Sequence, residues 1–376
     1  ARWREQLEKV KVAQGKIALE LQQMLAAGVA QASLFGAPEI NLDSQTQVVD
    51  ALKNLGVPVP DSTRGWQLQP LALDYPVVAK LLEYRGVAKS LSSFGENILE
   101  FIKPETGRIH SDFRQIGAPT GRFSCSKPNI QQIPHEEEYR RCFRAPDGRK
   151  LVIADYSQIE LRILADFSND ENFINAFKSG ADFHTITAAQ VFNVNPEEVT
   201  SDQRSFAKRL NFGVVYGIGS QRFALMTGLS QTEAENIMRR YFATYRGLDA
   251  WLRDAARKVV TERISRTASD RMYRFRFDEN DRQAIGGAQR NAKNFPIQGT
   301  SADILKRALH FLHERIRRTS ARLVNIVHDE IIVECDTADA EQTADILEKS
   351  MCEAGEEYVK KVPVKVDVKI ANEWTK

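Results

Sequence analysis

Apolar residues recur at helical spacing through the first hundred positions of the chain. Residues 12–25, 48–57 and 77–91 place them three or four apart, which predicts amphipathic helices. Between these segments, residues 34–45 are rich in turn formers, and residues 56–70 contain three prolines and two glycines. Such composition predicts a turn and a loop. The N-terminal part is therefore predicted to be helical with polar breaks.

The pattern changes at a continuous apolar run, residues 151–154, which ends at Asp155 and predicts a buried strand. Helical patterns follow to about Ile285. Two β-rich runs, 323–327 and 331–335, then surround three polar residues and predict a hairpin, and the alternation over 362–370 predicts one more strand. Strands on either side of a long helical region favour an α+β fold.

Length and composition limit the classes of protein. The 376 residues suggest two or three domains, and 42% hydrophobic with 27% charged residues excludes a collagen-like or wholly disordered chain. No apolar run approaches ~18 residues, so we expect no membrane helix. The first residues lack the features of a signal peptide, and the four cysteines show no C-x-x-C spacing. We therefore expect a cytoplasmic protein with reduced thiols.

Three carboxylates should meet if the predicted strands are neighbours in one sheet. Asp155 ends its strand, while Asp329 and Glu330 lie in the hairpin turn. Clustered carboxylates repel one another unless a cation neutralises them. Mg²⁺ prefers such oxygen ligands, and a pair of ions can stabilise phosphoryl transfer. The alternative is a strand-end cap and an ordinary polar turn.

A second candidate feature is the helix predicted from residue 200 onward. Thr200 and Gln203 have capping-box spacing. One ridge of the helix then carries two cations and two aromatic rings: Arg204, Lys208, Phe212 and Tyr216. Cations can bind phosphates, and rings can support a sugar and a base. The alternative is an amphipathic helix with a solvated edge. No G-x-x-x-x-G-K-[ST] motif occurs, which disfavours a P-loop ATPase.

These segments resemble the motifs of a known family. Residues 155–162 (DYSQIELR), 204–217 (R-x-x-x-K-x-x-x-N-F-G-x-x-Y-G) and 327–330 (VHDE) resemble motifs A, B and C of family A DNA polymerases, the relatives of bacterial DNA polymerase I. Residues 83–91, 104–113, 120–134 and 290–300 are also similar to the family. The resemblance runs from about residue 30 to the C-terminus.

The resemblance implies an α+β right-hand fold with an antiparallel-sheet palm and helical fingers and thumb. It assigns residues 1–98 to the thumb, 99–167 and 286–376 to the palm, and 168–285 to the fingers. It implies two Mg²⁺ ions, for which Mn²⁺ can substitute. Their ligands would be Asp155, Asp329 and the backbone carbonyl of Tyr156, with Glu330 as an accompanying catalytic carboxylate.

The resemblance also implies how the substrates are held. The dNTP would contact Arg204, Lys208, Phe212, Tyr216, His184 and Glu160. Within this set, Lys208 would also protonate the leaving pyrophosphate, and Glu160 would crowd the sugar 2′ position and so exclude ribonucleotides.

The primer–template would contact Arg122, Arg290, Asn294, Gln298 and His328. All correct base pairs present acceptors at equivalent minor-groove positions, so fixed donors can test pair geometry without reading sequence. Without the resemblance, Asn294 and Gln298 would be interpreted as helix-surface amides and Arg122 as a turn-stabilising cation.

The function implied is a template-directed DNA polymerase that binds primer–template and dNTPs, with no membrane partner, as a monomer in the cytoplasm of a bacterium or of a phage host. Two alternatives remain open: RNA-templated synthesis by the same site, or a catalytically silent primer–template-binding protein. Too few residues precede the thumb for an exonuclease domain, so we expect none in this chain. Residues 264–278 keep arginines but lose the glycine that is common in the family, and residues 165–170 also depart from its pattern. We interpret these departures as favouring a divergent, phage-type member.

The total charge of +2 conceals two opposite regions. Residues 237–276 hold eleven Lys or Arg against four Asp or Glu, and residues 327–357 hold one Lys against eleven acids. The basic region, in the expected fingers, could follow a template strand, and binding there should weaken as salt rises.

Overall fold

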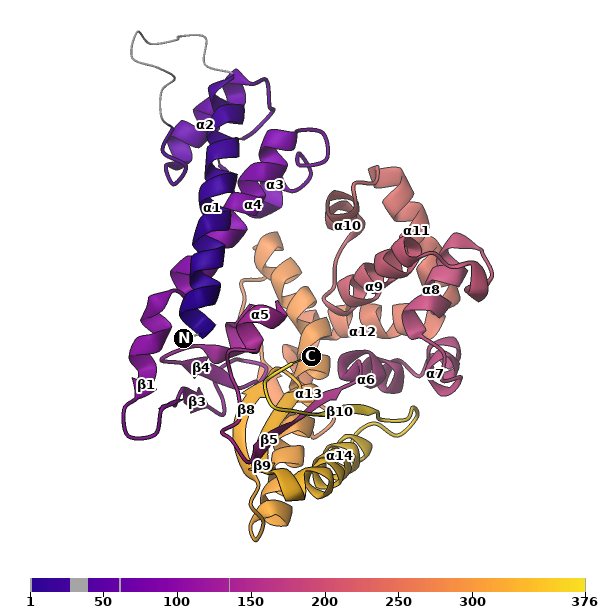
Figure 1. The fold of residues 1–376 in the computed structure, drawn as a ribbon. Coiled ribbons are helices and arrows are strands. Elements are labelled where there is room, and N and C mark those ends of the chain that lie inside the picture. Colours follow the sequence, from indigo (N-terminus) through magenta and orange to yellow (C-terminus); the bar gives the residue numbers. More distant parts are fainter. Residues whose placement is uncertain (1, 28–39, 61, 135, 376) are drawn as a thin grey trace. The chain divides into compact units, whose positions relative to one another are not determined.

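The chain folds into two compact units in a computed structural model that describes residues 2–27, 40–60, 62–134 and 136–375 (Figure 1). The first unit comprises residues 1–110, 133–142 and 224–230, and the second comprises residues 111–132, 143–223 and 231–376. Of the predicted turn at residues 34–45, residues 34–39 lie outside the described part of the chain. None of the helices in the described ranges is long and apolar enough to cross a membrane.

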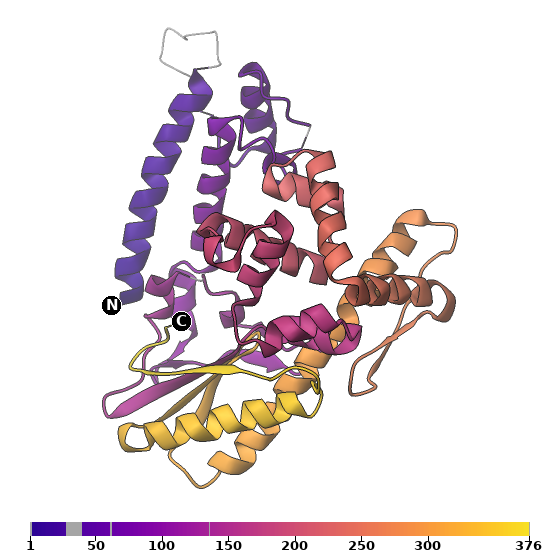
Figure 2. The same ribbon diagram turned by 90° about the vertical axis from the view of Figure 1, so that its right-hand side faces the viewer.

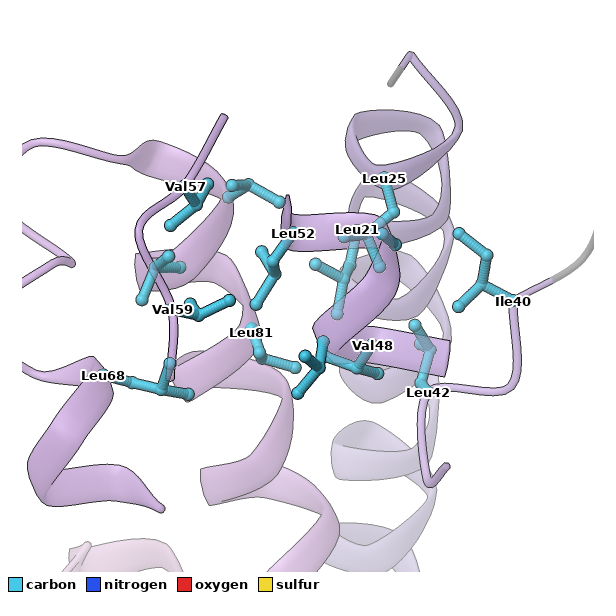
Figure 3. Close-up of a cluster of buried hydrophobic side chains, with 14 of the residues drawn as sticks. Leu21, Leu25, Ile40, Leu42, Val48, Leu52, Val57, Val59, Leu68 and Leu81 are labelled. Atoms are coloured by element: carbon cyan, nitrogen blue, oxygen red, sulfur yellow. The ribbon is translucent and has the colours of Figure 1, made fainter. Parts of the chain in front are cut away.

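The first unit is built on two long helices, α1 (Arg2–Ala26) and α4 (Pro76–Ser93), which pack against each other. With α2 (Gln45–Asn54) they bury a cluster of aliphatic side chains that includes Leu21, Leu52 and Leu81 (Figure 3). These buried positions follow the apolar spacing of the sequence, so the three predicted helices are confirmed. The predicted loop at 56–70 is wrong in part, because it contains one helical turn, α3.

The other elements of the first unit are short. They are α3 (Gly65–Leu68), the 3₁₀ helix η1 (Glu96–Phe101), the strands β1 (Ile102–Lys103) and β2 (Arg108–Ile109), α5 (Glu137–Arg140), and residues 224–227 of α10 (Ser220–Thr227).

A four-stranded antiparallel sheet, in the order β10-β5-β9-β8, forms the base of the second unit. Its strands are β5 (Arg149–Tyr156), β8 (Arg322–Val327), β9 (Glu330–Asp336) and β10 (Val366–Ala371). The predicted neighbourhood of the carboxylate-bearing strands is confirmed, because Asp155 pairs with Glu330 across β5 and β9. Together with its many helices, this sheet makes the protein an α+β protein.

Two predicted strand limits differ from the structure. The hairpin turn has two residues rather than three, since Glu330 is already paired with Val327, and His328 turns the chain with φ of 56°. The last strand starts at Val366 instead of residue 362. Pro363 in the earlier stretch has no N–H to donate to a sheet ladder.

Two helices support the sheet. α14 (Ala340–Glu356) packs on β5, β9 and β10, and α13 (Arg282–Ile316) runs along α14, as Figure 2 shows. Ion pairs join the two helices, Arg307 to Glu357 at 2.8 Å and Arg315 to Glu353. One face of the sheet is thereby fixed to a 35-residue helix that contains Pro296.

The remaining helices of the chain follow β5. They are α6 (Ile159–Ser168), α7 (Glu171–Lys178), α8 (Phe183–Phe192), α9 (Ser201–Val215), α10 (Ser220–Thr227), α11 (Gln231–Thr244) and α12 (Arg246–Glu262). Aromatic rings pack between α7, α8 and the start of α12: the ring of Phe173 contacts those of Phe177, Phe183 and Tyr245 at centroid distances between 4.6 and 5.9 Å. The predicted helical region is therefore confirmed over most of its length.

The sequence pattern missed a hairpin between α12 and α13, formed by β6 (Ile264–Arg266) and β7 (Met272–Arg274). The hairpin packs closely on α13, where a Cβ at Gly299 would lie 2.5 Å from Thr267. Small elements complete the second unit: β3 (Asp112–Arg114), β4 (Ser124–Ser126), and the 3₁₀ helices η2 (Ile130–Gln132), η3 (Pro196–Glu198) and η4 (Thr337–Asp339).

Candidate active site

A pocket of about 460 Å³ in the second unit gathers most of the predicted site residues. Its lining comes from the end of β5, the β8–β9 turn, the start of α6, one ridge of α9, and residues of α8, α13 and the 122–131 segment. Of the predicted residues, these line it: Arg122, Asp155, Tyr156, Glu160, His184, Arg204, Lys208, Phe212, Tyr216, His328 and Asp329.

Two aspartates lie at one end of the sheet. Asp155 is the penultimate residue of β5, and Asp329 occupies the turn that leads into β9. The backbone N–H of Tyr156 donates to the Asp329 carbonyl at 3.4 Å, which ties the two segments together. Two carboxylates and the Tyr156 backbone offer hard oxygen donors, and these suit Mg²⁺ or Mn²⁺.

Glu330 has a different environment from the two aspartates. It is 5% exposed, and its Oε1 accepts a hydrogen bond of 2.8 Å from Nε1 of Trp374, which is itself buried. Glu330 is absent from the described residues that line the pocket. Its carboxylate therefore joins the C-terminal segment to the sheet beside Asp155.

The predicted capping box at the start of α9 is present. The Thr200 side chain accepts from the Gln203 N–H at 3.2 Å, and the Gln203 side chain accepts from the Thr200 N–H at 2.9 Å. The four ridge residues of α9 all line the pocket. Because the capping box gives hydrogen-bond partners to backbone N–H groups at the start of α9, it fixes where this helix begins and hence which residues form the ridge.

The two cations of the ridge differ in their partners. Arg204 donates from Nε and Nη2 to both carboxylate oxygens of Asp182, at 3.0 and 2.8 Å. Burial tends to raise the pKa of Asp182, but hydrogen bonds from Arg204 and from Thr185 outweigh it and lower this pKa to about 2. Lys208 is exposed and makes no ion pair with any described residue.

His184 is buried behind the ridge, with 2% of its surface exposed. Its ring lies 5.7 Å from that of Phe212, and its Nδ1 lies 3.1 Å from Nδ2 of Asn211. Burial lowers the pKa of His184 to about 4, and the charges of Arg204 and Lys208 act in the same direction, against Asp182. The imidazole is therefore neutral at pH 7.

Glu160 is held by two of the other predicted residues. One carboxylate oxygen accepts from the Arg122 guanidinium, and the other accepts from the Tyr216 hydroxyl at 3.1 Å. Burial and the Glu160 charge raise the pKa of Tyr216 to about 12, so its hydroxyl remains a donor. Glu160 itself is 9% exposed, and these bonds leave its side chain fixed in the pocket wall.

The turn before Arg122 is anchored from the hairpin and from α13. The Arg271 guanidinium donates to the carbonyl of Thr120 at 2.6 Å and to Asp303 at 2.9 Å, and Lys306 donates to the carbonyl of Gly121 at 2.6 Å. Gly121 has φ of 83°, which favours glycine. Arg271 belongs to the arginine-rich segment that departs from the family pattern, and here it supports the Arg122 turn.

The other predicted primer–template residues lie on α13 at successive intervals of four. Arg290, Asn294 and Gln298 share one ridge of that helix but are not among the described residues that line the pocket. The Asn294 Oδ1 is buried and accepts no hydrogen bond from a described residue. His328 is exposed at the hairpin turn and does line the pocket.

Several polar residues of the site were missed from the sequence, among them Asp182, Asn211 and Gln131. Gln131 lines the pocket and donates to the Ile326 carbonyl at 3.2 Å. Asp182 caps α8 by accepting from the Thr185 N–H, and its place two residues before His184 is a helix-start signal that could have been used. Asn211 and Gln131 lie within the quoted motifs, but spacing alone does not distinguish them from surface amides.

An antiparallel sheet with two pocket-lining aspartates, facing a helix with cations and rings, suits a divalent ion together with an anionic, aromatic ligand. The model of DNA polymerase family A matches residues 10–376. The chain belongs to this family.

Curated relatives and a solved structure agree with the family model. The thermostable DNA polymerase I of Thermus aquaticus is 34% identical over 95% of this chain and 44% of its own length. DNA polymerase I of Aquifex aeolicus is 39% identical over 81% and 52%, respectively. The chain thus spans about half or less of these relatives. The fold is similar to the POL domain of Pol1 from M. smegmatis, in complex with DNA primer-template and dNTP, with a TM-score of 0.86, 29% identity, and coverage of 98% of this chain and 66% of that one.

Proposed function

We propose that this chain is a template-directed DNA polymerase that adds dNTPs to a primer 3′-OH. The observation that carries the proposal is the single pocket in which Asp155 and Asp329 face the cations and rings of α9. Family membership and the likeness to a polymerase domain bound to primer-template and dNTP support it. In this proposal residues 1–98 are the thumb, 168–285 the fingers, and 99–167 with 286–376 the palm.

Asp155, Asp329 and the Tyr156 carbonyl would hold two Mg²⁺ ions, or Mn²⁺ in their place. When bound, such ions stabilise charge on the attacking and leaving oxygens of phosphoryl transfer. The structure suits this role because Asp155 lies in β5 of the sheet, and the hydrogen bond from the Tyr156 N–H to the Asp329 carbonyl holds the turn that carries Asp329 beside it. Glu330, bonded to Trp374, would act by orienting this sheet end rather than by binding an ion.

The incoming nucleotide would lie along α9. Arg204, oriented by Asp182, would present its remaining N–H groups to the triphosphate. Lys208, exposed and without an ion-pair partner among the described residues, would contact the same phosphates and donate a proton to the leaving pyrophosphate. Phe212 and Tyr216, one and two turns further along the helix, would pack against the sugar and the templating base.

Two further sets of residues would select the correct substrate. Glu160, fixed by Arg122 and Tyr216, would exclude a 2′-hydroxyl, and His184 would add a neutral donor to the triphosphate. The primer–template minor groove would contact Arg122 and His328 beside the pocket, and the α13 ridge that bears Arg290, Asn294 and Gln298. The guanidinium of Arg290 and the amide nitrogens of Asn294 and Gln298 would supply the donors that the acceptors of the minor groove require.

Primer extension with purified variants tests the proposal. Asp155→Ala and Asp329→Ala should each reduce extension at least a thousandfold while leaving primer–template affinity within about threefold. Asp345→Ala is the matched control, because this aspartate is exposed on α14 and should extend as the unaltered chain does. Ordinary turnover by either metal-site variant would contradict the assignment. Binding of primer–template without extension by the unaltered chain would support a silent binding protein.

A further inference from the structure

A buried hydrogen-bond network connects α8, α9 and the start of α12 behind the candidate triphosphate site. It contains Asn211 and Thr187, both 0% exposed, together with His184 and Tyr245. Asn211 Nδ2 lies 3.1 Å from both His184 Nδ1 and Thr187 Oγ1. Of these residues His184 lines the pocket, so the others can act on a ligand only through it.

The donor and the acceptor of each hydrogen bond can be assigned from the number of protons that each group carries. Thr187 Oγ1 has one proton and two acceptors within reach, the Phe183 carbonyl at 3.0 Å and Asn211 Oδ1 at 3.4 Å, and the shorter distance assigns the proton to Phe183, one helical turn earlier. Because this proton is already used, the contact of 3.3 Å between Thr187 Oγ1 and the Tyr245 hydroxyl has Tyr245 as its donor. Thr187 must then accept from Asn211, which places the amide nitrogen of Asn211 on this side of its side chain.

The same amide nitrogen faces His184, so Nδ1 of the imidazole must be an acceptor without a proton. A neutral imidazole that accepts at Nδ1 carries its proton on Nε2. Burial, reinforced by the charges of Arg204 and Lys208, keeps this ring neutral at pH 7. His184 thereby offers an uncharged N–H donor at a pocket wall that also carries two cations.

We propose that Asn211 is a positioning residue that fixes the Nε2–H tautomer of His184, so that this imidazole donates to the triphosphate of the incoming nucleotide. The nucleotide part of this inference rests on the proposed function, whereas the tautomer part does not. With the opposite tautomer, a lone pair of Nε2 would face the anionic phosphates and repel them.

The tautomer can be measured without nucleotide or DNA. The full chain, labelled with ¹⁵N-histidine, gives long-range ¹H–¹⁵N correlations for its six histidines, and His184→Gln identifies the signal of interest. We expect a proton on Nε2 and none on Nδ1 at pH 7, without titration until the pH approaches about 4. A proton on Nδ1, or titration near pH 6.5, would overturn the proposal even if the chain extends primers normally. The expected tautomer in a chain that extends no primer would leave the tautomer part of the inference standing and would refute the proposed function together with the nucleotide part.

Asn211→Asp provides the functional readout. A carboxylate in place of the Asn211 amide would accept a hydrogen bond from a protonated Nδ1, so the pKa of His184 should rise. Three charged groups face this ring: Asp182 also raises its pKa, whereas Arg204 and Lys208 lower it. Above the new pKa the imidazole loses its Nε2 proton. The KM for dNTP should therefore rise about tenfold with pH, whereas that of the unaltered chain stays flat between pH 6 and 8.

Tyr245→Phe is the matched control, since it removes a hydroxyl from the same network one step further from His184. It should keep both the tautomer and the KM. An equal KM change in Tyr245→Phe, or a pH-independent KM in Asn211→Asp, would show that the network acts only by packing and would overturn the proposal. Should Asn211→Asp fail to fold, the histidine spectrum of the unaltered chain still decides.

Discussion

Discrimination against ribonucleotides should depend on how firmly Glu160 is held. The structure gives this carboxylate two partners, Arg122 and Tyr216, on separate oxygens, and buries it in the pocket wall. Glu160→Ala removes the obstructing group. Tyr216→Phe keeps the group and the aromatic ring but removes one of the two bonds. Glu160→Ala therefore measures the effect of the carboxylate itself, and Tyr216→Phe measures the effect of holding that carboxylate in place.

The expected magnitudes follow from these contacts. Rejection of one added hydroxyl by a pocket is worth about 100-fold, and Glu160→Ala should lose most of it. The Tyr216 hydroxyl makes a 3.1 Å hydrogen bond to a charged group, worth about 1.5 kcal/mol, so Tyr216→Phe should lose about tenfold. The loss should be smaller than that of Glu160→Ala, because Arg122 still holds the carboxylate.

The assay is single-nucleotide primer extension with dATP and ATP, expressed as the ratio of the two kcat/KM values. The variants should change this ratio chiefly through the ribonucleotide. An unchanged ratio in Glu160→Ala, with extension of dATP intact, would refute the assignment of this carboxylate to the 2′ position. An equal loss of discrimination in Glu160→Ala and Tyr216→Phe would refute the argument that Arg122 still holds the carboxylate when the Tyr216 hydroxyl is absent.

Three further perturbations test other contacts. Asp170 is buried and accepts from the N–H groups at the starts of α7 and α12, so Asp170→Ala should lower the free energy of unfolding by about 3 kcal/mol in urea titration, and Asp170→Asn by less. The pKa of Asp182, about 2, lies below its ordinary value, so the ion pair with Arg204 stabilises the fold above about pH 4. This stabilisation is lost as the pH falls toward 2. The difference in free energy of unfolding between the unaltered chain and Asp182→Asn should therefore shrink over that range. Arg271→Ala should release the turn before Arg122 and raise the KM for primer–template about tenfold while the dNTP KM stays constant, and a change confined to the dNTP KM would contradict this.

Much of the fold could be predicted from the chain because local pattern and burial agree there. The helices of residues 12–25, 48–57 and 77–91 present their apolar positions to one core, and the run that ends at Asp155 is buried on both faces of its sheet. The hairpin at 264–274 was missed because its strands have only three residues each, too few for an alternating pattern to be recognised. Its position depends on packing against Gly299 of a distant helix, which no local pattern contains.

For the candidate site, the sequence predicted which residues take part but not which partners hold them. The residue types and their order carry the resemblance, and the α9 ridge follows directly from helical spacing. The partners of these residues were not predictable. Glu330 looks equivalent to Asp329 in sequence, yet β-strand pairing places its carboxylate against Trp374, 44 residues later in the chain. Such pairings depend on the closed fold, because they join segments whose proximity is decided by the sheet order.

The two cations of α9, which the sequence presents as equivalent, should therefore act differently on a triphosphate. Asp182 occupies the edge of Arg204 that contains Nε and Nη2, so the opposite edge is oriented before a ligand arrives. A planar guanidinium can keep both partners, since its five N–H groups point in fixed directions. Lys208 has no such constraint among the described ion pairs, and its three donors rotate with a flexible stem. Arg204 is thus suited to hold the triphosphate in one place from binding to release, whereas Lys208 can follow the phosphate charge as it moves to the leaving group, which is the property that a proton donor requires.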